Sequence, residues 1–278
     1  MKLAWQRYGK GKVRVLKVHR QAGRHDVTEV SVDVGLEGDF ETSYTAGDNR
    51  KVVATDSIKN TVHVLAKSHL DSEIEKFAEV LADHFLEKYS QVSRVRIRIT
   101  ERLWDRWSSH EGPSPHTFSA GAQVKPFVEF EKSREETVMI SGVEDWLIMK
   151  TTESGFTDFV SDEFRTLPDT TDRVLASQIM ASWKFRSAPE NYVALREQIL
   201  SVMMEEFSRN YSPSVQTTLF QMAEAVLKEV SELSEVSLSM PNKHYLLINL
   251  QPFSLENRNE VFLPTDEPHG QIEATICR

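Results

Sequence analysis

A glycine-flanked lysine near the N-terminus is the first residue whose setting could support chemistry. Lys10 lies in Tyr8-Gly9-Lys10-Gly11-Lys12, directly before a predicted strand. Glycine on both sides predicts a turn in which the backbone approaches another group closely. The alternative is a solvated lysine at the start of a strand, because lysine side chains are mostly exposed.

Two segments that open predicted helices offer backbone N–H groups. Residues 55–57 (Thr-Asp-Ser) follow an apolar run, and the turn they predict exposes unpaired N–H groups and a hydroxyl. Residues 212–216 (Ser-Pro-Ser-Val-Gln) open a second helix, in which the N–H of Val215 could bind an acceptor. The amide of Gln216 could grip the edge of a heterocycle with two hydrogen bonds. Ordinary helix capping explains both segments equally well.

Three further side chains suit a planar, anionic ligand. Arg173 stands at the start of an apolar strand, and its guanidinium fork fits bidentate recognition of an anionic ring. Phe156, in Ser-Gly-Phe-Thr-Asp-Phe, could stack on a planar ligand, and His244, between two predicted strands, could shuttle a proton. The alternatives are a surface ion pair, a core aromatic residue and a structural histidine.

Composition restricts the class of protein that could use these groups. The 278 residues include 33 Lys and Arg against 42 Asp and Glu, for a net charge of −9, which argues against nucleic acid or an anionic membrane as the main partner. Cys277 is the one cysteine, so a disulfide framework and a multi-cysteine metal site are excluded. No apolar run reaches membrane-spanning length, the first residues lack a signal peptide's apolar stretch, and residues 276–278 are not a peroxisomal address. We therefore expect a cytoplasmic protein.

Hydrophobic periodicity predicts two similar halves, each with a strand pair, two helices and another strand pair. In the first half, valines alternate with polar residues at 13–15 and 30–36, and Val95, Ile97 and Ile99 alternate with arginines. The elements expected there are strands at these positions, helices at 57–69 and 72–89, and strands at 93–103 and 123–131. Ser72 with Glu75 is a candidate capping box for the second helix.

The second half repeats this order. Its expected elements are strands at 136–151 and 173–185, helices at 190–208 and 213–231, and strands at 234–240, 244–250 and 271–277. Ser212 is the expected N-cap of the last helix, with Pro213 at its first position. Residues 108–122 and 251–270 are expected loops, and 132–137 is the best candidate for a linker. The pattern predicts an α+β fold in which antiparallel sheets are backed by helices.

Taken together, the segments resemble the cofactor-independent urate oxidases over nearly the whole chain. The matching stretches are residues 7–10 (Arg-Tyr-Gly-Lys), 41–45 (Glu-Thr-Ser-Tyr-Thr), 53–61, 150–173 with Phe164 and Leu167, 214–216 (Ser-Val-Gln), 241–245 (Pro-Asn-Lys-His-Tyr) and 259–262 (Asn-Glu-Val-Phe). A chance match of so many ordered motifs is not credible. The resemblance therefore outweighs the alternative interpretation of each residue taken alone.

The resemblance implies two tandem tunnelling-fold units, at 1–134 and 135–278, and a tunnel-shaped homotetramer with active sites at subunit interfaces. It implies the reaction of urate with O₂ and water to give 5-hydroxyisourate and H₂O₂, a step of purine catabolism. O₂ is then a co-substrate, and neither a metal nor an organic cofactor is expected.

The resemblance also assigns roles to individual residues. Arg173 and Gln216 would clamp opposite sides of urate, and Phe156 would stack on its ring. Backbone N–H groups of Val215 and Asp56 would contact its heteroatoms.

Lys10, Thr55 and His244 resemble the family's proton relay, which generates the urate dianion. Asn242 and Thr55 would hold O₂ and later the attacking water. Thr55 and Asp56 would come from a neighbouring chain.

Two other functions remain open at this point. The first is another tunnelling-fold enzyme acting on pterins or purines, such as GTP cyclohydrolase or pyruvoyl-tetrahydropterin synthase. Several of these bind zinc through His and Cys and anchor the base through a glutamate, whereas this sequence has no such cluster and has Arg173 and Gln216 in the clamp motifs. The second is a urate-binding protein without turnover, which would require a broken relay.

Overall fold

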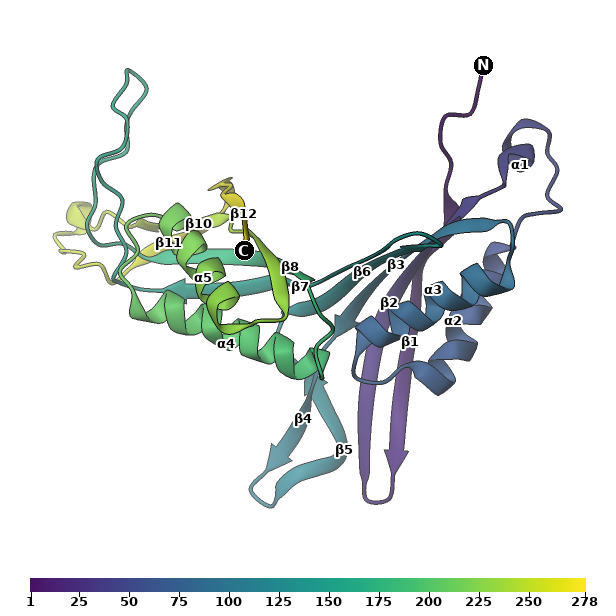
Figure 1. The fold of residues 1–278 in the computed structure, drawn as a ribbon. Helices are drawn as coiled ribbons and strands as arrows, with labels where there is room; N and C mark the ends of the chain where they lie inside the picture. Colours follow the sequence, from purple (N-terminus) through teal and green to yellow (C-terminus); the bar gives the residue numbers. More distant parts are fainter. The chain divides into compact units, whose positions relative to one another are not determined.

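The computed structural model describes residues 1–278, which form two compact units (Figure 1). Unit 1 comprises Met1–Gly142 together with Glu190–Val193, and unit 2 comprises Val143–Pro189 together with Ala194–Arg278. The assignment of tunnelling-fold units to 1–134 and 135–278 stays a prediction.

The sheet of unit 1 contains four antiparallel strands in the order β1-β2-β3-β6. They are β1 (Tyr8–Gln21), β2 (Arg24–Gly38), β3 (Val92–Arg102) and β6 (Lys125–Ser133). Val32 and Ile99 are direct partners across β2 and β3, and both are fully buried. The period of two in the sequence is therefore the alternation between a buried and a solvated face of this sheet.

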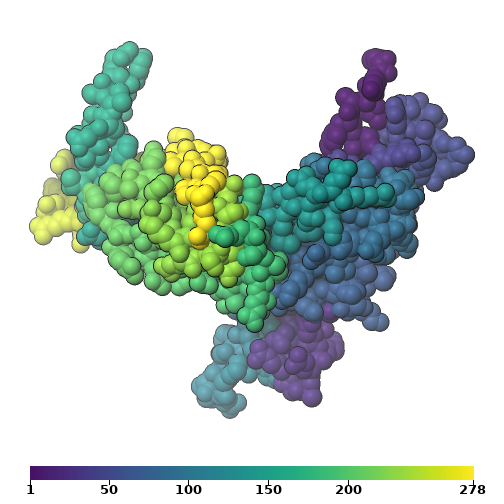
Figure 2. All heavy atoms as spheres, viewed as in Figure 1, coloured from purple at the N-terminus to yellow at the C-terminus, as the bar shows by residue number.

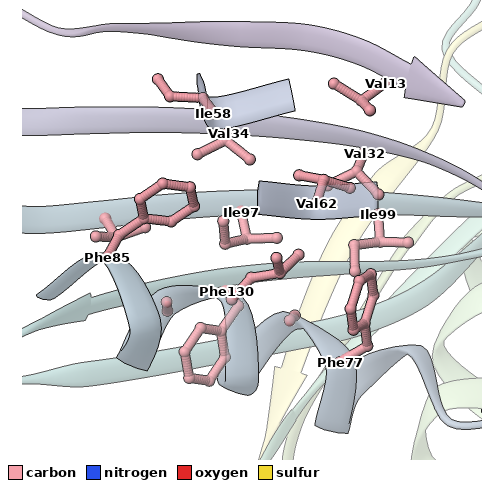
Figure 3. Close-up of a cluster of buried hydrophobic side chains, with 14 of the residues drawn as sticks. Val13, Val32, Val34, Ile58, Val62, Phe77, Phe85, Ile97, Ile99 and Phe130 are labelled. Atoms are coloured by element: carbon pink, nitrogen blue, oxygen red, sulfur yellow. The ribbon is translucent and has the colours of Figure 1, made fainter. Parts of the chain in front are cut away.

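Helices cover the buried face of this sheet. They are α2 (Thr55–His69) and α3 (Ile74–Lys88), whereas the short helix α1 (Glu41–Thr45) has no buried residue. Ile58 and Val62 of α2, together with Phe77 and Phe85 of α3, join the valines and isoleucines of the strands in one buried cluster (Figure 3). Burial of this apolar surface is the main favourable contribution to the fold of unit 1.

Residues 104–120 differ from the sequence prediction. The expected loop at 108–122 is mostly a two-stranded hairpin, β4 (Trp104–Ser109) with β5 (Gly112–Ala120). Its strands are mostly exposed, β5 contains Pro113 and Pro115, and both strands bury little apolar surface, so they lack the alternation that marks a half-buried strand. The guanidinium of Arg106 bonds the carbonyl of His25 and the carboxylate of Asp26 and thereby ties the hairpin to β2.

The expected linker at 132–137 is a tight turn. β6 extends to Ser133, β7 (Thr137–Lys150) begins at Thr137, and the Ser133 N–H donates to the Glu136 carbonyl at 2.8 Å. The charged residues between these strands are exposed because they form the outside of the turn. The polar composition that resembled a linker is that of a short turn.

The sheet of unit 2 contains β8 (Leu175–Phe185), which has β7 as its neighbour on one edge and pairs antiparallel with both β9 and β10 along the other. Its remaining strands are β9 (Leu233–Ser239), β10 (Asn242–Leu247), β11 (Phe262–Gly270) and β12 (Glu273–Cys277). β12 pairs with β9, and β11 pairs with β10. The helices are α4 (Tyr192–Arg209), α5 (Val215–Glu229) and the short 3₁₀ helix η1 (Gln251–Phe253). The first two residues of α4 belong to unit 1. α5 packs against β9 and β12.

Three expected details of the helices and loops are wrong. α3 begins at Ile74 without a side-chain cap, so Ser72 and Glu75 form no capping box; Glu75 is buried and bonds Ser141 instead. α5 begins at Val215, and its cap is Ser214, whose Oγ accepts from the Thr217 N–H at 3.1 Å. The expected loop at 251–270 contains η1 and β11.

The long connection between β7 and β8 projects from the rest of unit 2 (Figure 2). Val160 and Phe164 near its outer part are each 82% exposed. No helix combines the length and the apolar character needed to span a bilayer.

Candidate functional site

Lys10 lies inside β1, opposite Val34 of β2, at a bulge where the register of the two strands shifts before Val13. A Cβ atom on Gly9 would lie 1.8 Å from the Val34 carbonyl oxygen, so only glycine fits there. The expected close backbone approach is therefore confirmed, but it occurs at a strand bulge rather than a turn. Lys10 lines a cavity of about 600 Å³ in unit 1.

The N-terminus of α2 presents Thr55 and Asp56 to solvent. The first helical bond joins the Ile58 N–H to the Ala54 carbonyl at 3.0 Å, so the N–H groups of residues 55–57 precede the helical hydrogen-bond ladder. The N-cap residue is Ala54, and no side chain caps this end. The capping interpretation of Thr55 is thus wrong, and its hydroxyl is exposed together with these N–H groups.

β1, which carries Lys10, packs against α2, which begins with Thr55 and Asp56. A hydrogen bond from Lys59 at 2.6 Å is the largest cause of the lowered pKa of Asp56, and the positive charge of Lys10 contributes as well. Unit 1 therefore brings Lys10 and the start of α2 together, and we call Lys10, Thr55 and Asp56 the relay cluster.

Tyr8 contacts the segment that leads into this cluster, a role that the sequence did not indicate. Its hydroxyl accepts a hydrogen bond of 2.8 Å from the N–H of Val53, two residues before Thr55. Its ring packs edge-on against the buried Phe40, with centroids 4.8 Å apart. Burial raises the pKa of Tyr8 above its ordinary value. Its position two residues before Lys10 was the available signal, but nothing local indicates Val53 as a partner.

In unit 2, Phe156 and Arg173 come together. The Arg173 Cζ lies 5.5 Å from the centre of the Phe156 ring, and the Arg173 N–H donates to the Ser154 carbonyl at 2.8 Å. The backbones of Phe156 and Thr170 exchange two hydrogen bonds, of 2.7 and 3.0 Å. The ring also stacks on Phe159, so Phe156 is half-buried with a role in packing as well.

Arg173 is not a surface ion pair. Its Nε is buried without a hydrogen-bond partner in the chain, and burial lowers the pKa of the guanidinium. A buried, unpaired guanidinium donor is costly unless something else satisfies it. An anionic, planar ligand beside Phe156 would do so.

The start of α5 is held against the same segment. The Gly155 N–H donates to the Ser212 carbonyl at 2.8 Å, and the Ser212 N–H donates to the Glu153 carbonyl at 2.9 Å. These bonds bring the first turn of α5 to the side of the Phe156 segment. Val215 is buried, whereas Gln216 is exposed.

Asn242 and His244 lie within β10, which begins two residues before the strand expected at 244–250, so they do not lie between two strands as expected. Asn242 pairs with Ser177 of β8, shortly after Arg173, and His244 pairs with Thr265 of β11. Both are half-buried. We call the six unit 2 residues the clamp cluster: Phe156, Arg173, Val215, Gln216, Asn242 and His244.

A family model described as uricase matches residues 6–131 and again residues 139–273. The chain belongs to the uricase family. The uricase of Arthrobacter globiformis is 37% identical over 276 residues, which are 99% of this chain and 90% of that protein. The rabbit (Oryctolagus cuniculus) uricase is 36% identical, over 98% of this chain and 93% of the relative.

Solved uricase structures have the same fold. The Arthrobacter globiformis uricase superposes with a TM-score of 0.95 at 37% identity and covers all of this chain and 95% of that one. Urate oxidase from Bacillus sp. TB-90 superposes with a TM-score of 0.87 at 25% identity, over 98% of this chain and 100% of that one. The α+β fold with antiparallel sheets and two tandem uricase matches is thus confirmed, and the chain is an oxidoreductase of the uricase class.

All nine predicted site residues lie inside the two uricase matches. Three of them, the relay cluster, belong to unit 1, and the other six, the clamp cluster, belong to unit 2. Each cluster is formed by its own unit, and neither unit alone contains all nine residues. No group of three or more His, Cys, Asp or Glu side chains is arranged to hold a metal ion.

Proposed function

We propose that this enzyme oxidises urate with O₂ and water to 5-hydroxyisourate and H₂O₂, without a cofactor, in the cytoplasm. The observation that carries the proposal is the half-buried Arg173, whose buried Nε has no partner and whose guanidinium lies 5.5 Å from the centre of the Phe156 ring in a uricase fold. Urate is planar and anionic, so it stacks on the ring and accepts hydrogen bonds from the guanidinium. Gln216 grips the opposite edge, and the Val215 N–H binds a heteroatom.

The relay cluster supplies the proton transfer. Lys10 draws a proton from the urate monoanion through the Thr55 hydroxyl, His244 completes the relay, and the N–H of Asp56 contacts the ring. The resulting dianion is electron-rich, which favours one-electron transfer to O₂ within a preorganised pocket. Asn242 and Thr55 hold O₂ and then the water that attacks the oxidised ring.

Each active site takes its two clusters from two chains of a homotetramer. Lys10 on β1 and the start of α2 belong to elements that pack together in unit 1, so the chain that supplies Thr55 and Asp56 also supplies Lys10. A closed homo-oligomer repeats the same interface, so every chain gives its relay cluster to one active site and its clamp cluster to another.

Urate absorbance and H₂O₂, followed together in air with a metal chelator present, test the reaction. We expect loss of urate with one H₂O₂ formed per urate and no effect of chelator. Turnover that the chelator abolishes would contradict the proposal. Urate binding without turnover by the assembled protein would indicate a binding protein instead.

Mixing two impaired variants, assayed at a urate concentration below the wild-type KM so that each alone is nearly inactive, tests the shared site. Lys10→Met disables the relay cluster and Arg173→Ala disables the clamp cluster. If one site takes the two clusters from two chains, random co-assembly restores about a quarter of wild-type activity, because half of the pairs are mixed and each mixed pair regains one of two sites. No restoration in co-expressed, confirmed mixed oligomers would place both clusters of one site in the same chain.

A further inference from the structure

A tyrosine hydroxyl binds the backbone two residues before a predicted site residue in each unit. Tyr8 binds Val53, which precedes Thr55, and Tyr211 binds Thr171, which precedes Arg173. We infer that Tyr8 and Tyr211 are positioning residues, Tyr8 for proton transfer through the relay cluster and Tyr211 for urate binding by the clamp cluster. This inference rests on the proposed function.

Tyr8 acts on a buried segment. Val53 is 5% exposed, and its N–H has the Tyr8 hydroxyl as acceptor at 2.8 Å. The bond joins β1, which carries Lys10, to the residues that enter α2 at Thr55. Water has little access to Val53, so removal of the hydroxyl leaves a buried donor unpaired, and the segment shifts to find another acceptor. Such a shift changes the separation of Lys10 and Thr55.

Tyr211 acts on a more exposed segment. Its hydroxyl donates to the Thr171 carbonyl at 3.0 Å, and its side chain is 44% exposed. A Cβ atom on Gly155 would lie 2.1 Å from this hydroxyl oxygen, so glycine leaves the space that the hydroxyl occupies. Loss of the hydroxyl frees the backbone that carries Arg173.

The two roles predict different kinetics. Misplacement by about 1 Å costs a reaction step up to about a hundredfold, and here the loop can partly adjust. Tyr8→Phe keeps the ring against Phe40, and we expect kcat to fall about tenfold with KM for urate within about twofold. Tyr211→Phe should raise KM about threefold and leave kcat nearly unchanged, because water can replace the lost donor at Thr171.

Steady-state kinetics, thermal unfolding and anaerobic urate binding of the full-length variants test this. Without O₂, binding is measured free of turnover, so Tyr211→Phe should weaken it while Tyr8→Phe should not. Tyr89→Phe is the matched control, since its ring stacks on Phe85 in unit 1 and no hydrogen bond to its hydroxyl is present. We expect it to match the wild type.

Gly155→Ala provides a second, independent test of the role of Tyr211. The added Cβ would lie 2.1 Å from the Tyr211 hydroxyl oxygen and 2.9 Å from the Thr170 carbonyl oxygen, the first contact being much the closer, so we expect a rise in KM of about tenfold in the wild-type background. The rise should be smaller when Tyr211→Phe is already present, because the hydroxyl has been removed. Equal rises in both backgrounds would overturn the role of Tyr211.

A purely structural role makes a different prediction. Both tyrosine variants would then lower the melting temperature and the amount of active enzyme, with KM and anaerobic affinity unchanged in each. That result in an active wild type overturns the inference and leaves the proposed function intact. Failure of the wild type to oxidise urate rejects the proposed function itself.

Discussion

The relay cluster and the clamp cluster are built in different ways. Lys10 lies on a strand and Thr55 starts a helix, and both elements pack onto the buried core of unit 1 (Figure 3). Phe156 and Arg173 instead lie in the irregular connection between β7 and β8, which individual backbone bonds hold to the segment before α5.

This difference has a physical consequence for function. Groups that transfer a proton must keep a separation fixed within a few tenths of an ångström, which a packed strand and helix provide. A clamp must open for its ligand, and a loop held by a few hydrogen bonds opens at lower free-energy cost than a sheet. Substitutions in the two clusters should therefore change different kinetic constants.

The largest effect is expected at Lys10. Lys10→Met removes the proton acceptor, and kcat should fall about a thousandfold while KM changes about twofold or less. Steady-state kinetics in air measure both constants. Lys12→Met is the matched control, because Lys12 lies at the same bulge but is exposed and pairs with Asp33 at 3.3 Å. Near-normal turnover of Lys10→Met would show that Lys10 is not the proton acceptor and that the relay cluster has no role in proton transfer.

The next largest effect is expected at Arg173. Arg173→Ala removes a charged, bidentate donor, so urate affinity should fall about a hundredfold with a smaller loss of kcat. Anaerobic urate titration measures the affinity directly. Arg209→Ala, which removes an exposed arginine paired with Glu205 at 3.5 Å, serves as the control. Unchanged affinity in Arg173→Ala would mean that another group binds urate.

The third effect is expected on stability rather than on urate binding, at a lysine that supports the clamp cluster without being part of it. The Lys150 ammonium donates to the carbonyls of Asn210 at 2.6 Å and Phe207 at 3.2 Å and so caps the end of α4 just before Tyr211. Burial lowers the pKa of Lys150. Lys150→Met should lower the free energy of unfolding by about 2 kcal/mol, because the carbonyls lose a charged donor.

Thermal unfolding of Lys150→Met measures this loss. The control is Lys184→Met, which removes a surface ion pair with Glu235 at 3.0 Å and should cost about 0.5 kcal/mol. Equal losses in the two variants would show that Lys150 contributes no more than a surface charge.

The smallest effect concerns the acid stability of unit 1. Burial is the main cause of the lowered pKa of His84 on α3, and the charge of Lys88 adds to it. The folded state therefore binds this proton less readily than the unfolded state, so stability falls as the pH drops below about 6.5 towards the lowered pKa.

Melting temperature as a function of pH measures this contribution. His84→Gln should flatten the decline between about pH 6.5 and 5, whereas His63→Gln, exposed on α2, should not. The same slope in the wild type and in His84→Gln would assign the acid sensitivity to other groups.

Most regular elements of the chain could be predicted because their periodicity reflects burial. The alternation at 30–36 follows the buried and solvated faces of β2, and the helices expected at 57–69 and 72–89 match α2 and α3 closely. The β4–β5 hairpin and β11 were missed because their strands bury too little apolar surface to alternate. The predicted caps at Thr55 and Ser72 are wrong because a local motif cannot show whether its hydroxyl accepts a hydrogen bond from the first turn of the helix.

The sequence by itself determined the uricase family, the α+β class and the identities of the candidate site residues. Short ordered motifs and hydrophobic periodicity are local features, so they can be recognised in the sequence alone. Only the tertiary structure decided how these residues are grouped. The Tyr8–Val53 bond, the buried Nε of Arg173 and the approach of its guanidinium to Phe156 depend on segments that are distant in sequence or joined by irregular chain. Such contacts arise from the packing of whole elements, and no local pattern of residues records them.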